Sequence, residues 1–226
     1  MEQITVLLAE DHTIVREGLR ALLAAEGDIE VIGEAQTGRQ AVQLARELRP
    51  DVVIMDIAMP LLNGLEATRQ ILKAVPGTRV LILSAYNDDE YVRRAVLLGA
   101  AGYLIKQTSA DSLSKAIREV QKGNTFFSPS IANRLRGLYL ESPDGGRVRR
   151  KKKAGLSSHE VEVLQLIAEG KANKQVAAEL GISIKTVEKH RQHLMRKLDL
   201  HDTAGLTRYA IAAGIIESRV QMTIIE

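Results

Sequence analysis

The segment Val52-Val53-Ile54-Met55-Asp56 is a short apolar run that ends in a carboxylate. The N-terminal run Ile4-Thr5-Val6-Leu7-Leu8-Ala9 ends in the same way, because Glu10 and Asp11 follow it directly. Continuous apolar strands of this length are typical of a parallel sheet that is covered on both faces. The carboxyl ends of parallel strands meet at one edge of the sheet, where ligand sites lie. The two runs therefore predict an edge at which three carboxylates converge.

The strand pattern occurs five times in residues 1–125, and an amphipathic helical stretch follows each strand. This alternation predicts an α/β doubly wound five-stranded parallel sheet. Ser84 and Lys106 close the fourth and fifth strands, so they are expected at the same edge as the acids. The expected strands are Ile4–Ala9, Ile29–Ala35, Val52–Met55, Arg79–Ser84 and Gly102–Lys106, and the expected helices lie near Thr13–Ala25, Gly38–Arg49, Leu65–Lys73, Asp89–Leu98 and Ala110–Lys122.

The C-terminal part has an all-helical pattern. Ser157 and Glu160 fit a capping box at the start of its first helix. Asn173 and Ser183 are expected to cap the next two helices, and a fourth is expected at Thr203–Ala213. A short helix, a turn containing glycine and a longer basic helix follow the order of a helix-turn-helix. We therefore predict a second, all-α four-helix helix-turn-helix domain.

The segment between these two patterns is unsuited to a hydrophobic core. Ser128-Pro129 is expected to open a helix that ends near Leu140, and residues 141–155 combine proline and glycine with the basic run 147–153. Such a composition is typical of a tether. The predicted organisation is a first domain at 1–125, a linker with a helix and a basic tether at 126–154, and a second domain at 155–226.

The two parts of the chain differ in charge. Residues 1–146 hold 16 Lys+Arg and 19 Asp+Glu, a net charge of −3, whereas residues 147–226 hold 15 and 9, a net charge of +6. The basic helical part favours a polyanionic partner. The absence of cysteine excludes disulfides and thiolate metal sites. Because no long apolar run or basic-then-apolar leader is present, we expect a cytoplasmic protein without a membrane partner.

Three carboxylates at one point repel one another unless a cation joins them. Glu10, Asp11 and Asp56 offer only oxygen ligands, which favour Mg²⁺ and leave room for phosphate oxygens. Asp56 is the predicted nucleophile, which would take up a phosphoryl group as an acyl phosphate. Lys106 would pair with a phosphoryl oxygen as a point charge, and the Ser84 hydroxyl would donate to another. The cation would offset the charge of the transferring group.

The third helix of the basic part has two unlike faces at about 100° per residue. Val187, Leu194 and Leu198 lie on the packing side, and the opposite side carries lysines, an arginine and a glutamine, which can contact phosphates and read bases in the major groove. Glu188 at the border could accept a hydrogen bond from cytosine. The commoner alternative is a solvated charged face. The predicted DNA contacts are Lys174, Lys185, Thr186, Glu188, Lys189, Arg191, Gln192 and Arg196.

Residues 1–122 resemble the receiver domain of two-component response regulators. The motifs are Glu10-Asp11, Asp56 with Met59-Pro60 and Gly64, Ser84-Ala85, and Tyr103-x-x-Lys106. The resemblance implies a flavodoxin-like fold, phosphorylation of Asp56 by a sensor histidine kinase, and a Mg²⁺ ligand from the backbone carbonyl of Ala58. It also implies a switch in which Ser84 moves toward the phosphoryl group and Tyr103 turns inward.

Residues 156–216 resemble the LuxR-type helix-turn-helix. The motifs are Leu156-Ser157-x-x-Glu160, Leu164-x-x-Ile167-Ala168-Glu169-Gly170, Asn173-Lys174, Ile182-Ser183-x-x-Thr186-Val187-x-x-His190 and Lys197-Leu198. Together the two resemblances identify the chain as a member of the NarL/FixJ subfamily. They imply that phosphorylation controls homodimerisation and binding to double-stranded promoter DNA, with RNA polymerase as a further partner. No enzyme activity is expected beyond the receiver's own phosphorylation and dephosphorylation.

Three alternatives remain open at this point. An aspartyl-phosphate phosphohydrolase usually has a second acid two residues after the nucleophile, where this chain has Ala58. A dinucleotide-binding enzyme would need a G-x-G-x-x-G motif after the first strand, which the sequence lacks. A protein-interaction relay with no DNA output is a third possibility, and the basic helix face argues against it.

Overall fold

The computed structural model describes residues 3–86, 88–129, 131–133, 135 and 156–217. The chain divides into two compact units, Met1–Lys153 and Ala154–Glu226. The predicted tether, including the basic run 147–153, lies outside the described residues. Within the described ranges, no helix combines the length and the apolarity that crossing a membrane requires.

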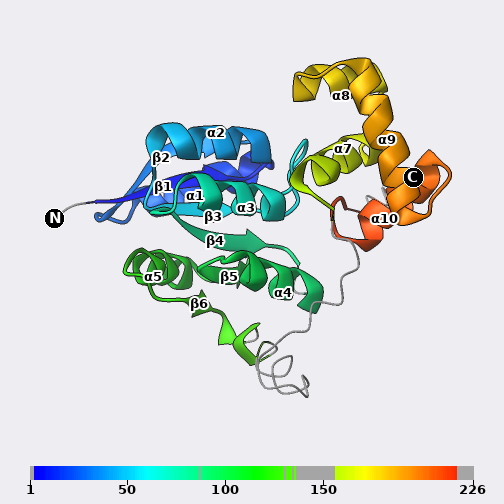
Figure 1. The fold of residues 1–226 in the computed structure, drawn as a ribbon. Helices are drawn as coiled ribbons and strands as arrows, with labels where there is room; N and C mark the ends of the chain where they lie inside the picture. The colour runs from blue at the N-terminus through cyan, green and yellow to red at the C-terminus, as the bar shows by residue number, and fades with distance from the viewer. Residues whose placement is uncertain (1–2, 87, 130, 134, 136–155, 218–226) are drawn as a thin grey trace, which may run out of the picture. The chain divides into compact units, whose positions relative to one another are not determined.

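The first unit is built on a parallel sheet whose strand order is β2-β1-β3-β4-β5-β6 (Figure 1). The α/β doubly wound prediction is confirmed, but the sheet has six strands rather than five. The unpredicted strand, β6, has only two residues, too few to show a periodic pattern. The strands are β1 (Ile4–Ala9), β2 (Ile29–Ala35), β3 (Val52–Met55), β4 (Arg79–Ser84), β5 (Gly102–Ile105) and β6 (Phe126–Phe127).

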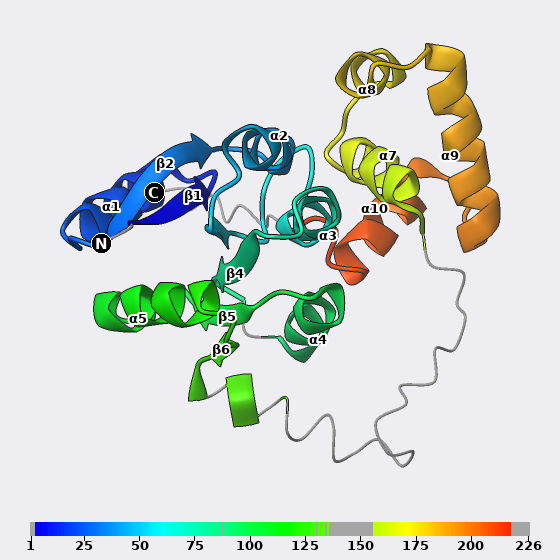
Figure 2. The same ribbon diagram turned by 60° about the vertical axis from the view of Figure 1, so that its left-hand side comes forward.

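Five helices with described bounds cover the two faces of this sheet. Figure 2 shows α1 and α5 on one side and α2, α3 and α4 on the other. Each face has its own buried apolar cluster, so the central strands β1, β3 and β4 are mostly apolar, as two-sided burial requires. The helices are α1 (Thr13–Ala24), α2 (Gly38–Leu48), α3 (Gly64–Ala74), α4 (Asp89–Leu98) and α5 (Ala110–Gln121).

The fold of the first unit continues past residue 125. Phe126 and Phe127 pair with Gly102 and Tyr103 of β5, and a Cβ on Gly102 would lie 2.4 Å from the Phe126 carbonyl oxygen. Only a glycine at this position lets the two strands approach so closely. Ile131, in the helical stretch that follows Ser128, is fully buried in the same core cluster as Tyr103. The predicted end of that helix near Leu140 lies outside the described residues.

The second unit consists of four described helices, as predicted: α7 (Ser158–Ala168), α8 (Asn173–Leu180), α9 (Ile184–Leu198) and α10 (Thr203–Ala212). The capping box of Ser157 and Glu160 is present, and Ser183 caps α9 by accepting from the Thr186 backbone N–H. One cap differs from the prediction: Asn173 is the first residue of α8, and Ala172 is its N-cap. The Ala172 backbone N–H donates to Gln175 Oε1, so a glutamine in the first turn does part of the capping.

Candidate functional site

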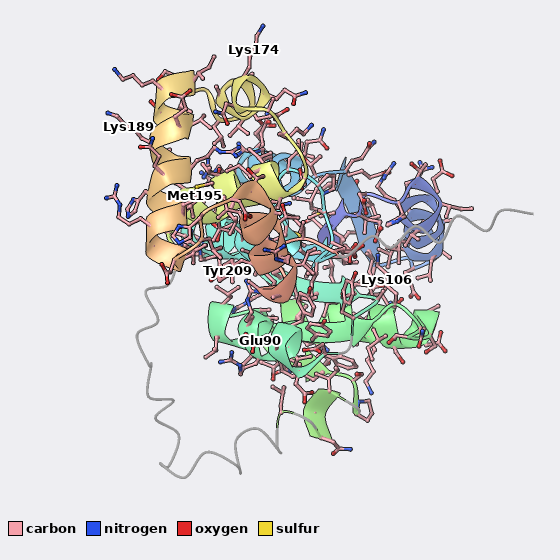
Figure 3. All side chains as sticks on the ribbon, turned by 90° about the vertical axis from the view of Figure 1, so that its right-hand side faces the viewer. Glu90, Lys106, Lys174, Lys189, Met195 and Tyr209 are labelled. Carbon is pink, nitrogen blue, oxygen red and sulfur yellow. The ribbon has the colours of Figure 1, made fainter. Side chains whose placement is uncertain are left out.

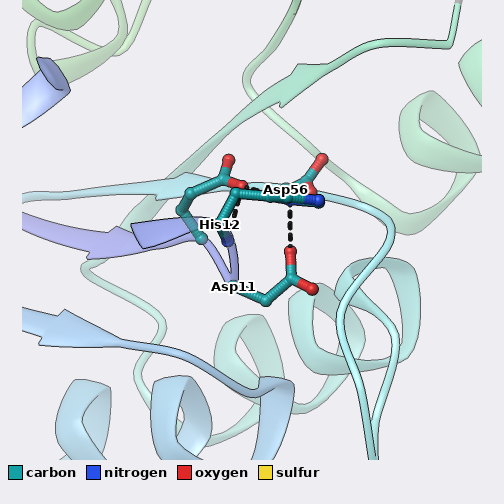
Figure 4. A group of neighbouring side chains, drawn as sticks. Asp11, His12 and Asp56 are labelled. Carbon is teal, nitrogen blue, oxygen red and sulfur yellow. Dashed lines mark hydrogen bonds and ion pairs between the residues drawn. The ribbon is translucent and has the colours of Figure 1, made fainter. Parts of the chain in front are cut away.

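Four charged side chains meet at the carboxyl edge of the sheet. Glu10 and Asp11 follow β1, Asp56 follows β3 and Lys106 follows β5. The Lys106 Nζ lies 2.7 Å from Glu10 Oε2 and 3.0 Å from Asp56 Oδ2. Figure 4 shows Asp11, His12 and Asp56 in one cluster, with a dashed line that joins Asp11 to His12. The structure thus brings together the acids and the lysine that the strand ends predicted.

The loop after Asp56 is fixed by close backbone contacts. The Ile57 backbone N–H donates to Asp56 Oδ1 at 2.8 Å, and the Gly64 N–H donates to the Ile57 carbonyl at 2.9 Å. A Cβ on Gly64 would lie 1.8 Å from the Asp56 carbonyl oxygen, so only glycine fits at the start of α3. Asn63 caps that helix by accepting from the Glu66 N–H. The carboxylate of Asp56 is therefore held on a rigid loop.

Burial and the neighbouring charges shift the pKa values of Asp56 and Lys106. Burial raises the pKa of Asp56, the Lys106 ammonium lowers it and the Glu10 carboxylate raises it, and the net pKa is about 6. Burial also favours the neutral form of Lys106, but Asp56 and Glu10 outweigh it and raise its pKa. Lys106 is therefore a permanent cation at physiological pH, and Asp56 is a carboxylate above about pH 6.

The raised pKa makes the Asp56 charge a cost to folding. Between pH 3.8, the ordinary pKa of this carboxyl group, and about pH 6, the folded protein binds the Asp56 proton more tightly than the unfolded chain does. The contribution of Asp56 to the free energy of unfolding therefore falls as the pH rises through this range. We expect D56N to raise the free energy of unfolding at pH 8 in EDTA by on the order of 2 kcal/mol, and to have little effect below pH 4. Urea unfolding at both pH values measures this, with the exposed Glu30→Gln as control. Equal stability of D56N and wild type at pH 8 would contradict the burial argument.

The ligand atoms of Glu10, Asp11, His12 and Asp56 lie within 4.8 Å of one another. Glu10 and Asp56 are buried, and Asp11 is largely so, with a side chain that is 14% exposed. Clustered carboxylates with one nearby ammonium leave negative charge to be offset, and their oxygen atoms suit Mg²⁺. The residues present therefore fit a divalent cation. Ala58 belongs to the same loop, two residues after Asp56.

Ser84 and Tyr103 meet around the backbone of Tyr86. The Tyr103 hydroxyl donates to the Tyr86 carbonyl at 2.7 Å, and the Tyr86 N–H donates to the Ser84 hydroxyl at 3.1 Å. Tyr103 is fully buried, and burial raises the pKa of its hydroxyl, which stays a donor. The Tyr86 ring stacks on Tyr91 of α4 with centroids 5.1 Å apart. Tyr103 is therefore turned inward in this structure, and one loop joins both candidate switch residues to α4.

Sequence reasoning missed two residues beside the acids. His12 lies 2.9 Å from Asp11 and 3.1 Å from Glu10 through its Nδ1. Arg16, although in the buried layer of α1, donates to the Glu10 backbone carbonyl at 2.9 Å and pairs with Glu34. An arginine at a core-facing helix position was the available signal, because such a charge needs buried partners.

The predicted nucleic-acid face is present on α9. Val187 and Leu194 are fully buried on one side of the helix. Figure 3 shows the side chains of Lys189 on α9 and Lys174 on α8 projecting outward. Within the described part of the chain, no ion pair engages the lysines or the arginine of this face. Its exposed residues are Lys185, Glu188, Lys189, Gln192 and Arg196.

Two predicted DNA contacts have hydrogen-bond partners within the second unit. Arg191 donates to Asn173 Oδ1 at 3.2 Å and to Thr203 Oγ1 at 2.7 Å, so it joins the first residues of α8 and α10. The Thr186 hydroxyl lies 2.8 Å from the Ser183 hydroxyl in the cap of α9. Arg191 therefore has a structural role that helical periodicity alone did not reveal, because both partners lie outside α9.

A partly buried ion pair joins α9 to α7. Lys197 Nζ lies 2.7 Å from Glu160 Oε2, and the same carboxylate accepts from the Ser157 N–H. Burial alone would raise the pKa of Glu160, but the Lys197 ammonium and the Ser157 cap together hold it below its ordinary value. The glutamate of the capping box thus also orients the basic helix.

Comparison with known proteins agrees with both halves of the molecule. Residues 6–118 match the response regulator receiver domain, and residues 154–210 match the luxR family of bacterial regulatory proteins. The chain is 40% identical over 207 residues to the transcriptional regulatory protein LiaR of Bacillus subtilis, covering 92% of this chain and 96% of LiaR.

Solved structures of similar proteins include DNA complexes. The two-component response regulator RcsB in complex with DNA is 27% identical, with a TM-score of 0.56, over 92% of this chain and 98% of that one. A second structure, of two RcsB dimers bound to two parallel DNAs, gives the same identity, TM-score and coverage. The resemblance that the motifs predicted is confirmed.

Proposed function

The chain belongs to the two-component response regulators that join a receiver domain to a LuxR-type DNA-binding domain, and we propose that phosphorylation of Asp56 controls its binding to promoter DNA. The observation that carries this proposal is the contact of Lys106 with both Glu10 and Asp56 at the sheet edge. That arrangement places the Lys106 ammonium beside the carboxylate nucleophile of Asp56. The exposed basic helix α9 of the same chain would bind the DNA.

In the proposed reaction, an Asp56 carboxylate oxygen attacks the phosphorus atom of the donor. The bond between phosphorus and the donor's leaving atom breaks, its electron pair stays with the leaving group, and an aspartyl phosphate forms. Lys106 then pairs with a phosphoryl oxygen from its place 3.0 Å from Asp56. The Ser84 hydroxyl lies at the same edge of the sheet and would donate a hydrogen bond to another phosphoryl oxygen. No activity is proposed beyond this phosphorylation and its reversal.

Glu10, Asp11, Asp56 and the carbonyl of Ala58 would hold Mg²⁺, which when bound supplies charge neutralisation for the phosphoryl group. The chain's own residues set the geometry. Arg16 fixes the backbone of Glu10, and the Ile57 N–H fixes one oxygen of Asp56. The nucleophile is thereby oriented before the donor arrives, which lowers the entropic cost of reaction.

The link to the output passes through β5 in this proposal. Tyr103 and Lys106 lie on and beside β5, and Tyr103 pairs with Phe127 of β6, which leads toward the linker. A change at Ser84 and Tyr103 would therefore act on the elements that precede the second unit.

We propose that the exposed face of α9 contacts DNA and that Lys174 of α8 contacts a phosphate of the DNA backbone. RcsB, the DNA-bound structural neighbour, supports this role and a dimeric arrangement. For this chain we propose a homodimer on paired half-sites, a sensor histidine kinase as phosphoryl donor and RNA polymerase as the downstream partner.

The test is DNA binding at several salt concentrations, with Mg²⁺, and with and without a small-molecule phosphodonor. The DNA is a fragment selected by the wild-type protein from random sequences. We expect the phosphodonor to tighten wild-type binding by about tenfold, within the usual range of allosteric coupling, and D56A to show no change. The exposed Glu30→Ala should respond like wild type.

The other outcomes separate the alternatives. Equal tightening in D56A would remove Asp56 as the switch but keep the DNA-binding role. Failure to select any DNA sequence in either state would favour an interaction relay instead.

A further inference from the structure

His12 occupies a position that ordinary folding requirements do not explain. It is the N-cap of α1, yet its side chain makes no capping hydrogen bond. Serine, threonine, aspartate and asparagine are preferred there because their oxygens accept from the first turn. The imidazole is also 60% exposed, so it contributes little to the core. Neither capping nor packing accounts for a histidine here.

The ring is turned toward the acids. Nδ1 lies 2.9 Å from Asp11 Oδ1 and 3.1 Å from Glu10 Oε1, and the His12 backbone N–H donates to the same Glu10 oxygen at 3.1 Å (Figure 4). One imidazole nitrogen thus lies among the carboxylate oxygens rather than facing away from them.

A second observation comes from Asp56. Its Oδ2 atom is buried, and among the described residues its partner is the Lys106 ammonium at 3.0 Å. Buried carboxylate oxygens normally have hydrogen-bond partners. A carboxylate oxygen can hold more than one partner, so this buried atom, which belongs to the same cluster as the His12 nitrogen, has capacity left to bind a cation.

We propose that His12 is a specificity-determining residue of this site, which makes it a mixed nitrogen–oxygen site for divalent cations. This inference rests on the cation site of the proposed function. Magnesium prefers oxygen ligands and gains little from imidazole, whereas Co²⁺ and Ni²⁺ bind imidazole nitrogen well. The chain's site therefore discriminates less against these ions than a site built from carboxylates alone.

The decisive variant is His12→Ser. Serine is a favoured N-cap, so the variant keeps or strengthens α1 while it removes the nitrogen. Titration calorimetry with the metal chloride alone, without a phosphodonor, gives the affinities for Co²⁺ and Mg²⁺. We expect the Co²⁺ affinity to fall by about tenfold and the Mg²⁺ affinity to change by less than about threefold. The visible absorption of bound Co²⁺ should shift as well, because the ligand set has changed.

Two controls separate the possible failures. His159→Ser removes an exposed histidine of the other unit and should change neither affinity. Asp11→Asn should weaken both ions; if it does not, the proposed cation site itself is wrong. If Asp11→Asn weakens both ions but His12→Ser changes Co²⁺ and Mg²⁺ equally, the cation site stands and the role of His12 is overturned.

Discussion

Gly64→Ala is expected to destabilise the receiver domain by about 3 kcal/mol or more and to prevent phosphorylation of Asp56. The added Cβ would lie 1.8 Å from the Asp56 carbonyl oxygen, 2.8 Å from its carbon and 3.0 Å from Ile57 Cα. All three are backbone atoms, so no side-chain rotation relieves the clash. The loop that carries the nucleophile must move, and this movement breaks the hydrogen bond from Gly64 to Ile57.

Urea unfolding of the full chain measures the destabilisation, and phosphoprotein electrophoresis after treatment with a phosphodonor measures the second effect. Gly18→Ala is the matched control, because Gly18 lies exposed within α1 and a Cβ there meets nothing within 4 Å. Alanine is the better helix former, so this control should gain roughly 0.5–1 kcal/mol. A Gly64→Ala protein as stable as wild type would show that the loop tolerates displacement.

The site of Asp56 could be predicted from sequence because parallel strands impose a simple rule. Apolar runs identified the strands, and the residues at their carboxyl ends had to meet. Glu10, Asp56 and Lys106 were found this way without knowledge of any side-chain direction. The same reasoning could not find Arg16, whose role depends on where α1 turns its side chain, and it stopped at the two carboxylates that precede His12, the N-cap of that helix.

Local patterns failed where partners come from distant segments. β6 is too short to have a period, and its presence depends on the absence of a Cβ at Gly102, some two dozen residues earlier. Arg191 was predicted as a DNA contact because the sequence shows only its place on α9. Its hydrogen bonds to Asn173 and Thr203 join helices whose packing the sequence does not specify. Periodicity predicts which face of an element is buried, but not which polar partners the packing brings.

The triple variant K185A/K189A/R196A is expected to bind the selected DNA at least a hundredfold more weakly, a loss of about 3 kcal/mol or more. Each basic side chain on a base or phosphate contributes about 1–3 kcal/mol, and all three lie on the exposed side of α9. The salt dependence should also flatten, by roughly one unit of slope for each phosphate that no longer has a basic partner. The fold should survive, because Val187 and Leu194 on the packed side are untouched.

A charge-matched control decides whether the location of these charges matters. K73A/K115A/K122A removes three exposed lysines of the first unit, so the net charge changes by the same amount. This control should bind DNA with nearly wild-type affinity and salt slope if α9 is the contact surface. A similar weakening in both triple variants would mean that net charge alone attracts DNA. Wild-type affinity in the α9 variant would instead place the DNA on another surface. Only a selective weakening in the α9 variant, with its circular dichroism unchanged, supports α9 as the reading helix.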